Sequence, residues 1–161
     1  MHKAGPVTIL LAEDDPAHAE IVSRNLSIFC AQTRIAHVED GQAALDYLFH
    51  KGPYANRIIS PRPAVILLDL RLPKVDGLEL LRRKKTDAEL AKIPAVVLST
   101  SRAGSDVAAA YAHGAASYLV KPENFKDFSS LMEAFCSYWL AWNTFPAEEN
   151  ISAENHEYPY R

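Results

Sequence analysis

Short apolar runs alternate along this chain with longer stretches in which apolar residues recur at helical spacing. Three of the runs are almost continuously apolar and include β-branched residues, as is typical of strands buried on both faces of a parallel sheet. These runs are Val7–Ala12, Val65–Leu68 and Ala95–Leu98. Two further short runs, Thr33–Val38 and Ala116–Val120, predict additional strands of the same sheet.

The segments between these runs predict helices. Asp15 followed by Pro16 suits the start of a helix that extends to about Cys30. The other helices are expected from Asp40-Gly41 to Gly52-Pro53, after Gly77, from Ser105 to Gly114 and, capped by Asn124, from Phe125 to Trp142. Strict alternation of strands and helices predicts a parallel sheet with helices on both faces.

Composition narrows the class of protein. The chain has 161 residues, of which 48% are hydrophobic and 23% are charged, as in an ordinary globular domain. A net charge of −3 argues against nucleic acid as the main partner. No apolar run approaches the roughly 18 residues of a membrane span, and residues 1–6 form a short leader without features of a signal peptide. We therefore expect a cytoplasmic protein.

The two cysteines, Cys30 and Cys136, lie far apart in the sequence, each in an apolar helical context. This pattern favours buried free thiols in a reducing compartment over a metal site or a disulfide.

Polar side chains with complementary chemistry follow the predicted strands. They are Glu13 and Asp14 after the first strand, Asp69 after the third, Ser99 after the fourth and Lys121 after the fifth. Because the carboxyl ends of parallel strands meet at one edge of a sheet, these groups should converge. Close carboxylates repel one another, and a hard divalent cation such as Mg²⁺ or Ca²⁺ relieves that repulsion. An ammonium and a hydroxyl alongside suit a transferred phosphoryl group.

Four segments around these strand ends resemble response regulator receiver domains in order and spacing. They are Ala12–Pro16, Leu67–Pro73 with Asp76-Gly77, Leu98–Thr100, and Gly114–Pro122. The resemblance covers about residues 7–142, which we take as the receiver domain. It implies a flavodoxin-like (βα)5 fold with a doubly wound parallel sheet of strand order 2-1-3-4-5.

The resemblance also implies a role for each acidic residue. Asp69 would be the phosphoacceptor, and Asp14 and Asp69 would hold Mg²⁺ directly, together with the backbone carbonyl of Arg71. Glu13, at a position where many members carry Asp, would act partly through water. Lys121 would pair with one phosphoryl oxygen.

The same resemblance implies a conformational switch. Ser99 would hydrogen-bond to a phosphoryl oxygen, and Tyr118 matches the family's rotameric switch aromatic. The bond before Pro122 is usually cis in the family.

The implied function is that of a single-domain response regulator that accepts a phosphoryl group from a sensor histidine kinase. Its phosphotransfer and dephosphorylation would be self-catalysed, without other enzymatic activity. Three parts of the chain resemble stand-alone regulators of phytochrome-type kinases. They are the loop Lys51–Pro63, the run Ser99-Thr100-Ser101 and the aromatic-rich stretch Tyr138–Trp142. The alternative is a receiver-like interaction module that never takes phosphate.

Two enzyme classes fit less well. An aspartyl phosphatase of the haloacid-dehalogenase type needs a second acid two residues after its nucleophile, where this chain has Arg71. A dinucleotide-binding enzyme needs a G-x-G-x-x-G turn after its first strand, and none is present.

The last predicted helix is rich in aromatic residues. One helical face, with Phe125, Phe128, Phe135 and Trp139, is expected to pack in the core. Tyr138 and Trp142 lie off that face, and with Phe145 they predict a homodimer surface. Residues 143–161 would then form an arm that reaches the other subunit, the competing possibility being a tail that folds back on its own subunit.

Overall fold

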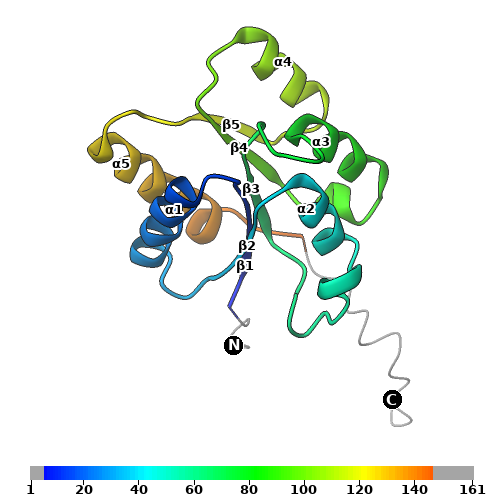
Figure 1. Ribbon diagram of the computed structural model, residues 1–161. Helices are drawn as coiled ribbons and strands as arrows, with labels where there is room; N and C mark the ends of the chain where they lie inside the picture. The colour runs from blue at the N-terminus through cyan, green and yellow to red at the C-terminus, as the bar shows by residue number, and fades with distance from the viewer. Residues whose placement is uncertain (1–5, 147–161) are drawn as a thin grey trace.

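The five predicted strands form one parallel sheet. The structure is a computed structural model that describes residues 6–146 (Figure 1). The strands are β1 (Thr8–Ala12), β2 (Arg34–Val38), β3 (Val65–Leu68), β4 (Ala95–Ser99) and β5 (Ser117–Val120). Their order, β2-β1-β3-β4-β5, confirms the predicted flavodoxin-like topology.

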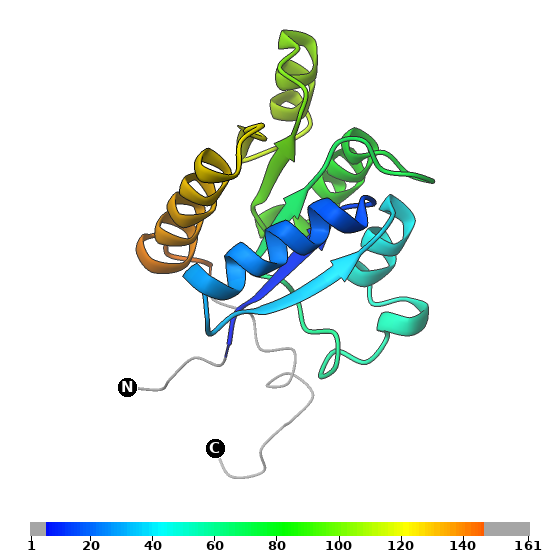
Figure 2. The same ribbon diagram turned by 60° about the vertical axis from the view of Figure 1, so that its left-hand side comes forward.

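Five α-helices cover the two faces of this sheet. They are α1 (Pro16–Phe29), α2 (Gly41–Leu48), α3 (Gly77–Thr86), α4 (Gly104–Ala112) and α5 (Phe125–Cys136). Helices α1 and α5 lie side by side on one face, and α2, α3 and α4 lie on the other (Figures 1 and 2). Each strand therefore leads into a helix at the same edge of the sheet.

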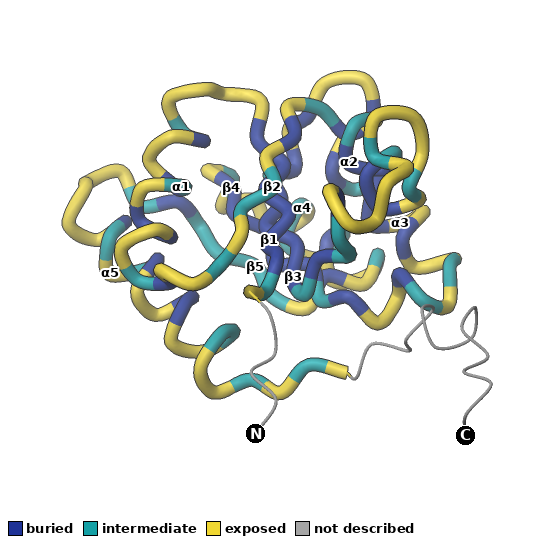
Figure 3. Tube along the Cα trace, turned by 90° about the horizontal axis from the view of Figure 1, so that it is seen from below, coloured by how far each residue is buried: buried dark blue, intermediate teal, exposed yellow. Residues whose placement is uncertain are grey.

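Two hydrophobic cores result from this arrangement, because successive residues of a strand point to opposite faces. Along β3, Val65 and Leu67 pack with α1 and α5, whereas Ile66 and Leu68 pack with the other helices. We call these the α1/α5 core and the α2/α3/α4 core. The three central strands, β1, β3 and β4, are buried along their whole length, and Figure 3 shows them in dark blue.

Most predicted helix starts are confirmed by their caps. The side chain of Asp15 accepts hydrogen bonds from the backbone N–H groups of Ala17 and His18, and Asn124 caps α5 in the same way. The predicted cap at Ser105 is wrong, because α4 begins one residue earlier, after Ala103, without a side-chain cap.

One predicted helix is shorter than expected. Helix α2 ends at Leu48, and the Gly52–Tyr54 segment is a separate 3₁₀ turn, η1. The helix predicted after Gly77, whose end the sequence did not define, ends at Thr86 and is followed by a second 3₁₀ turn, η2 (Leu90–Lys92).

The predicted last helix is divided into two parts. The α-helix α5 ends at Cys136 and continues as a π-helix, η3 (Ser137–Trp142). The predicted core stripe is wrong at Phe125, which is 69% exposed, while Phe128 and Phe135 are buried.

The cysteines form a disulfide between Cys30 and Cys136, so the prediction of two free thiols is wrong. Cys30 caps the C-terminal end of α1, and Cys136 is the last residue of α5. Since these helices lie side by side and end together, their Cα atoms are 5.9 Å apart despite a sequence separation of 106 residues. The cysteines therefore give no support to a reducing compartment, because that inference depended on their being free thiols.

The predicted leader and tail lie largely outside the described residues. At the edge of the described part, Phe145 is partly buried and packs against the α1/α5 core of its own chain. Within residues 6–146, no helix is long and apolar enough to cross a membrane.

Candidate functional site

The carboxyl edge of the sheet brings the predicted acidic residues together. Glu13 and Asp14 follow β1 directly, and Asp69 follows β3, the strand next to it. The backbone N–H of Asp69 donates to the carbonyl of Ala12 at 3.0 Å, and the N–H of Glu13 donates to the carbonyl of Val38 at 3.1 Å. These backbone hydrogen bonds extend the sheet by one residue and so fix the positions of the Cα atoms that carry the two side chains.

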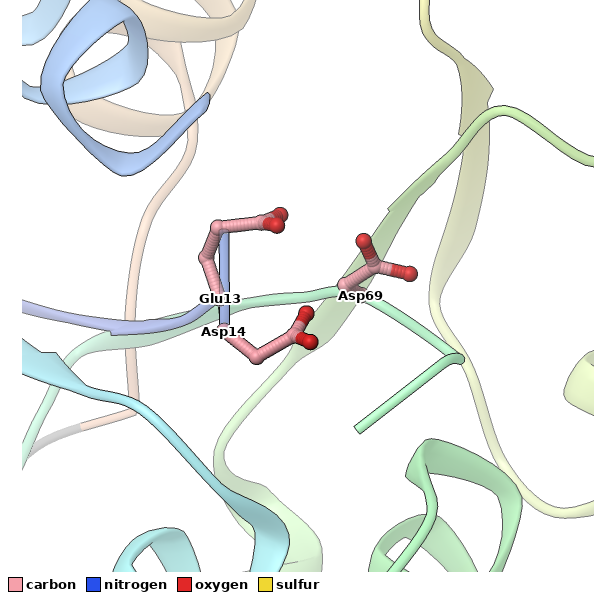
Figure 4. Close-up of side chains that lie close together, drawn as sticks. All are labelled: Glu13, Asp14 and Asp69. Carbon is pink, nitrogen blue, oxygen red and sulfur yellow. The ribbon is translucent and has the colours of Figure 1, made fainter. Parts of the chain in front are cut away.

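Oxygen atoms of Glu13, Asp14 and Asp69 all lie within 4.8 Å of one another (Figure 4). The three carboxylates differ in exposure: Glu13 is buried, Asp69 is 11% exposed at its side chain, and Asp14 is exposed. An all-oxygen donor set of this spacing suits a hard divalent cation, which can be reached from solvent on the Asp14 side.

Lys121 neutralises part of this negative charge. Its Nζ donates to Oε2 of Glu13 at 2.8 Å and to Oδ2 of Asp69 at 3.1 Å. The backbone N–H of Lys121 donates to the carbonyl of Ser99 at 2.8 Å, which holds the start of this side chain beside β4. The ammonium is therefore shared between a buried carboxylate and the predicted phosphoacceptor.

Burial and ion pairing shift the pKa of Glu13 in opposite directions, and the same holds for the pKa of Lys121. Burial raises the pKa of Glu13 above its ordinary value, although the hydrogen bond from Lys121 opposes the shift. Burial lowers the pKa of Lys121, but its hydrogen bond to Glu13 and the charges of Asp69 and Glu13 outweigh burial, so the net shift is upward. Lys121 therefore stays charged at neutral pH and can bind an anionic oxygen.

The second oxygen of Asp69 is fixed by the turn that follows it. Oδ1 accepts a hydrogen bond from the backbone N–H of Arg71 at 3.0 Å. The turn closes tightly, with the N–H of Gly77 donating to the carbonyl of Leu70 at 2.9 Å. A Cβ atom at position 77 would lie 2.6 Å from the carbonyl oxygen of Asp69, so this close approach requires glycine.

An open cavity of about 520 Å³ adjoins the acidic cluster on the Asp14 side. Its walls include Asp14, Arg71 and Asp76, with Asp106 from α4. A phosphoryl donor can approach the carboxylates from this side without displacing the core.

Ser99 and Tyr118 both contact the loop that leads from β4 to α4. Ser99 is 1% exposed, and its Oγ accepts a hydrogen bond from the backbone N–H of Ser101 at 3.2 Å. Tyr118, on β5, is partly buried against the α2/α3/α4 core, and its hydroxyl donates to the carbonyl of Ser101 at 2.9 Å. Ser101 therefore links the two predicted switch residues.

The expected cis bond before Pro122 is wrong, since residues 6–146 contain no cis peptide bond. Lys121 reaches Glu13 and Asp69 with the trans bond. A cis bond is thus not needed to aim this ammonium into the site.

The sequence-based prediction missed two histidines beside the site. Nδ1 of His18 lies 3.4 Å from Nζ of Lys121 and 3.8 Å from Oε1 of Glu13. Nε2 of His37 lies 2.8 Å from the carbonyl oxygen of Glu13. The position of His18 in the first turn of a helix that starts at the acidic pair was the available clue.

Comparison with known proteins identifies close relatives. A model of the response regulator receiver domain matches residues 9–133. The probable methanogenesis regulatory protein FilR2 of Methanothrix harundinacea is 44% identical over 142 residues, which are 88% of this chain and 88% of FilR2. Response regulator Rcp1 of a Synechocystis species is 41% identical over 142 residues, which are 88% of this chain and 95% of Rcp1.

Solved structures have the same fold. The Mn²⁺-bound form of Rcp1 superimposes with a TM-score of 0.82 at 40% identity, covering 88% of this chain and 100% of that one. The phosphorylated cyanobacterial phytochrome response regulator RcpA superimposes with a TM-score of 0.83 at 35% identity, covering 89% of this chain and 100% of that one.

Proposed function

Because this chain belongs to the response regulator receiver family, we propose that it accepts a phosphoryl group from a sensor histidine kinase onto Asp69. The observation that carries the proposal is the position of Asp69 beside Asp14 and Glu13, with the ammonium of Lys121 shared between Asp69 and Glu13. This arrangement leaves a carboxylate nucleophile in a site that can neutralise three phosphoryl oxygens.

In the proposed reaction a carboxylate oxygen of Asp69 attacks the phosphorus of a phosphohistidine. The new O–P bond forms as the P–N bond breaks, and the imidazole leaves with the electron pair and takes up a proton. Lys121 turns from Asp69 to a phosphoryl oxygen, while the N–H of Arg71 keeps the other carboxylate oxygen in place. Water later hydrolyses the acyl phosphate, so the protein returns to its starting state.

A divalent cation would supply charge neutralisation on the phosphoryl oxygens, and Mg²⁺ suits the oxygen donor set. We propose that Asp14 and Asp69 hold it directly, with the backbone carbonyl of Arg71. Glu13 acts through water because its two oxygens already accept hydrogen bonds from Lys121 and from the backbone N–H of Asp15. The Mn²⁺ bound in the structure of Rcp1 supports a metal of this type.

Ser99 and Tyr118 provide the proposed switch. A phosphoryl group adds about 1.5 to 2 negative charges at the strand ends. The Ser99 hydroxyl turns toward it and gives up its contact with the N–H of Ser101, and Tyr118 then moves with the released loop. Removing the hydroxyl in Ser99→Ala should weaken the conformational response while phosphorylation continues.

The proposed kinase partner is of the phytochrome type, since RcpA is a phytochrome response regulator. We place this phosphotransfer in the cytoplasm. Neither nucleic acid nor a membrane is expected as a partner.

We also propose a homodimer through the end of α5 and η3. The side chains of Tyr138 and Trp142 carry this proposal, because they are 56% and 81% exposed. Phe145, the third predicted dimer residue, is partly buried on its own chain and contributes less. Sedimentation of the full chain and of a chain cut after Asn143 tests the dimer and the arm separately. A full chain that stays monomeric at tens of micromolar, with or without phosphate on Asp69, contradicts the dimer.

The phosphoacceptor is tested by incubation with acetyl phosphate and Mg²⁺, followed by intact mass. The wild-type protein should gain one phosphoryl mass, and Asp69→Asn should gain none. Asp46→Asn, which alters a partly exposed aspartate on α2, is the matched control and should react normally. Phosphoryl gain by Asp69→Asn would show another nucleophile, whereas no gain by the wild type would favour the phosphate-independent interaction module.

A further inference from the structure

The disulfide joins the two helices that begin at the phosphoacceptor site. Helix α1 begins after Asp15, beside Glu13 and Asp14, and α5 begins after Asn124, three residues beyond Lys121. Both helices end at the bridged cysteines. With a rise of about 1.5 Å per residue, a helix of 14 residues places the bridge about 21 Å from the site. The bridge is thus remote from the phosphotransfer chemistry.

The bridge lies in the wall of a surface cavity, not in a sealed core. Cys30 and Cys136 are 7% and 4% exposed, and both line a cavity of about 890 Å³. Glu133 and Thr33 contribute polar groups to the same cavity. A small thiol that enters this cavity therefore reaches the two residues that form the bridge.

The segment after the bridge has few other attachments. Residues 137–145, which we call the aromatic segment, continue directly from Cys136 as η3 and the three residues after it. Trp139, Leu140 and Phe145 pack against the α1/α5 core. Within the described residues, no side-chain hydrogen bond or ion pair joins the aromatic segment to another element. Apolar contacts and the bridge at its base therefore hold this segment in place.

We propose that the Cys30–Cys136 bridge is a reducible latch, opened by a dithiol reductant, that controls the position of the aromatic segment while leaving the phosphoacceptor site intact. Buried residues from both helices, including Val22, Leu26 and Met132, keep α1 and α5 packed when the bridge opens. The change is therefore confined to the helix ends and the aromatic segment, where Tyr138 and Trp142 are exposed.

The chemistry is thiol–disulfide exchange. A thiolate of the reductant attacks one cysteine sulfur, the S–S bond breaks, and the other cysteine leaves as a thiolate that takes up a proton. The second thiol of the reductant then displaces the remaining cysteine and closes its own disulfide. The protein gains two electrons and two protons, and the dithiol is oxidised.

The packing of the helices makes a dithiol necessary. After the first step, the released cysteine stays beside the mixed disulfide, because α1 and α5 hold the two Cα atoms 5.9 Å apart in the closed state. With a monothiol reductant, this cysteine attacks the mixed disulfide and restores the bridge. With a dithiol, the intramolecular second step competes with that return. Dithiothreitol should therefore open the latch at thiol concentrations at which glutathione leaves it closed.

The full-length protein carries its own reporter for the test, since both of its tryptophans, Trp139 and Trp142, lie in the aromatic segment. Native protein is treated with dithiothreitol or glutathione, alkylated with N-ethylmaleimide and weighed, and tryptophan emission is recorded. We expect no adduct in the oxidised protein, alkylation of both cysteines after dithiothreitol, and a red shift of emission as Trp139 becomes hydrated.

Two controls separate the latch from other effects of the reductant. Cys30→Ser combined with Cys136→Ser should show the red-shifted emission without reductant and no response to dithiothreitol. If the variant folds poorly, tryptophan emission of oxidised and reduced wild-type protein compares the closed and open bridge without any substitution. Phosphorylation of Asp69 by acetyl phosphate should be equal in the oxidised and reduced proteins.

Three results would overturn the proposal. Alkylation of untreated protein would show that the bridge does not form. Alkylation that requires denaturant even with dithiothreitol would show that reductants do not reach it. Alkylation of both cysteines with unchanged tryptophan emission would show that the bridge does not control the aromatic segment.

Discussion

The two faces of the sheet are held together by different means. On the α1/α5 face, a disulfide supplements a well-buried apolar interface that includes Leu26 and Met132. On the opposite face, α4 begins without a side-chain cap and buries only Ala110, and α3 buries the cationic side chain of Lys84. The first face is therefore fixed, and the second retains weak points at which it can rearrange.

If Asp69 accepts the phosphoryl group as proposed, this difference predicts where the resulting displacement travels. Lys121 leads into α5, whose far end is bonded to α1, so motion in that direction is resisted. Ser99 leads through Ser101 into α4, which has few buried anchors. A displacement at the strand ends should therefore appear mainly in α4 and β5, and four predictions test this asymmetry.

The largest effect should come from removing the covalent bond on the fixed face. Cys30→Ser with Cys136→Ser opens a loop of 106 residues. The loop-entropy model then predicts a loss of about 4 to 5 kcal/mol from the free energy of unfolding. Urea unfolding of the variant and of oxidised wild type measures the loss, with reduced wild type as control. A loss under about 1 kcal/mol would mean that apolar packing alone holds this face together.

The second prediction concerns the metal site, which lies between the two faces. Loss of an outer-shell partner typically weakens metal binding about 10- to 100-fold, and loss of a direct ligand should cost at least as much. Asp14→Ala should therefore weaken Mg²⁺ binding more than Glu13→Gln, because Glu13 is already engaged by Lys121. Titration of each variant with Mg²⁺ in a calorimeter compares the two affinities. Equal losses would reassign Glu13 as a direct ligand.

The third prediction removes the buried charge from the second face. Burial lowers the pKa of Lys84 to about 8 from 10.5. Between these values the unfolded chain binds more protons than the folded one, so stability rises with pH across that window, and below pH 8 the buried charge destabilises the fold. Lys84→Met should therefore add about 1 to 3 kcal/mol at pH 7, and the gain should vanish near pH 10.5.

Urea unfolding at pH 7 and pH 10 checks this dependence. Lys126→Met is the matched control, because this lysine is exposed in the first turn of α5 and its change should leave stability within about 0.5 kcal/mol. A gain from Lys84→Met that is equal at both pH values would reflect packing and not charge.

The acidic site was predictable because its position depends on backbone geometry. Glu13, Asp69 and Lys121 each follow a strand, and the rule that parallel strands end at one edge was enough to place them together. The pairing of Cys30 with Cys136 was not predictable in the same way. It depends on how far α1 and α5 extend and on their meeting at one end, which no local pattern specifies.

Errors at helix ends have a similar origin. Phe125 has the spacing of a core residue but lies in the first turn of α5, beyond the edge of the sheet that would cover it. A π-helix follows α5 directly after Cys136, and helical spacing in the sequence does not distinguish it from an α-helix. His18 was overlooked because its relation to Lys121 joins residues 103 positions apart.

The smallest effect should come from one hydrogen bond on the weaker face. Tyr118→Phe removes the bond from the Tyr118 hydroxyl to the carbonyl of Ser101 and leaves the ring in place. A net hydrogen bond contributes about 1 kcal/mol, so local opening of the loop before α4 should become about fivefold more frequent. Hydrogen exchange should therefore accelerate in residues 101–112 and remain unchanged in α1, which the bridge secures.

Phosphorylation by acetyl phosphate should proceed at the wild-type rate, because Tyr118 makes no contact with Asp69 among the described hydrogen bonds. Faster exchange on both faces would mean that the two faces are coupled through the sheet, and the asymmetry between them would then not direct the signal.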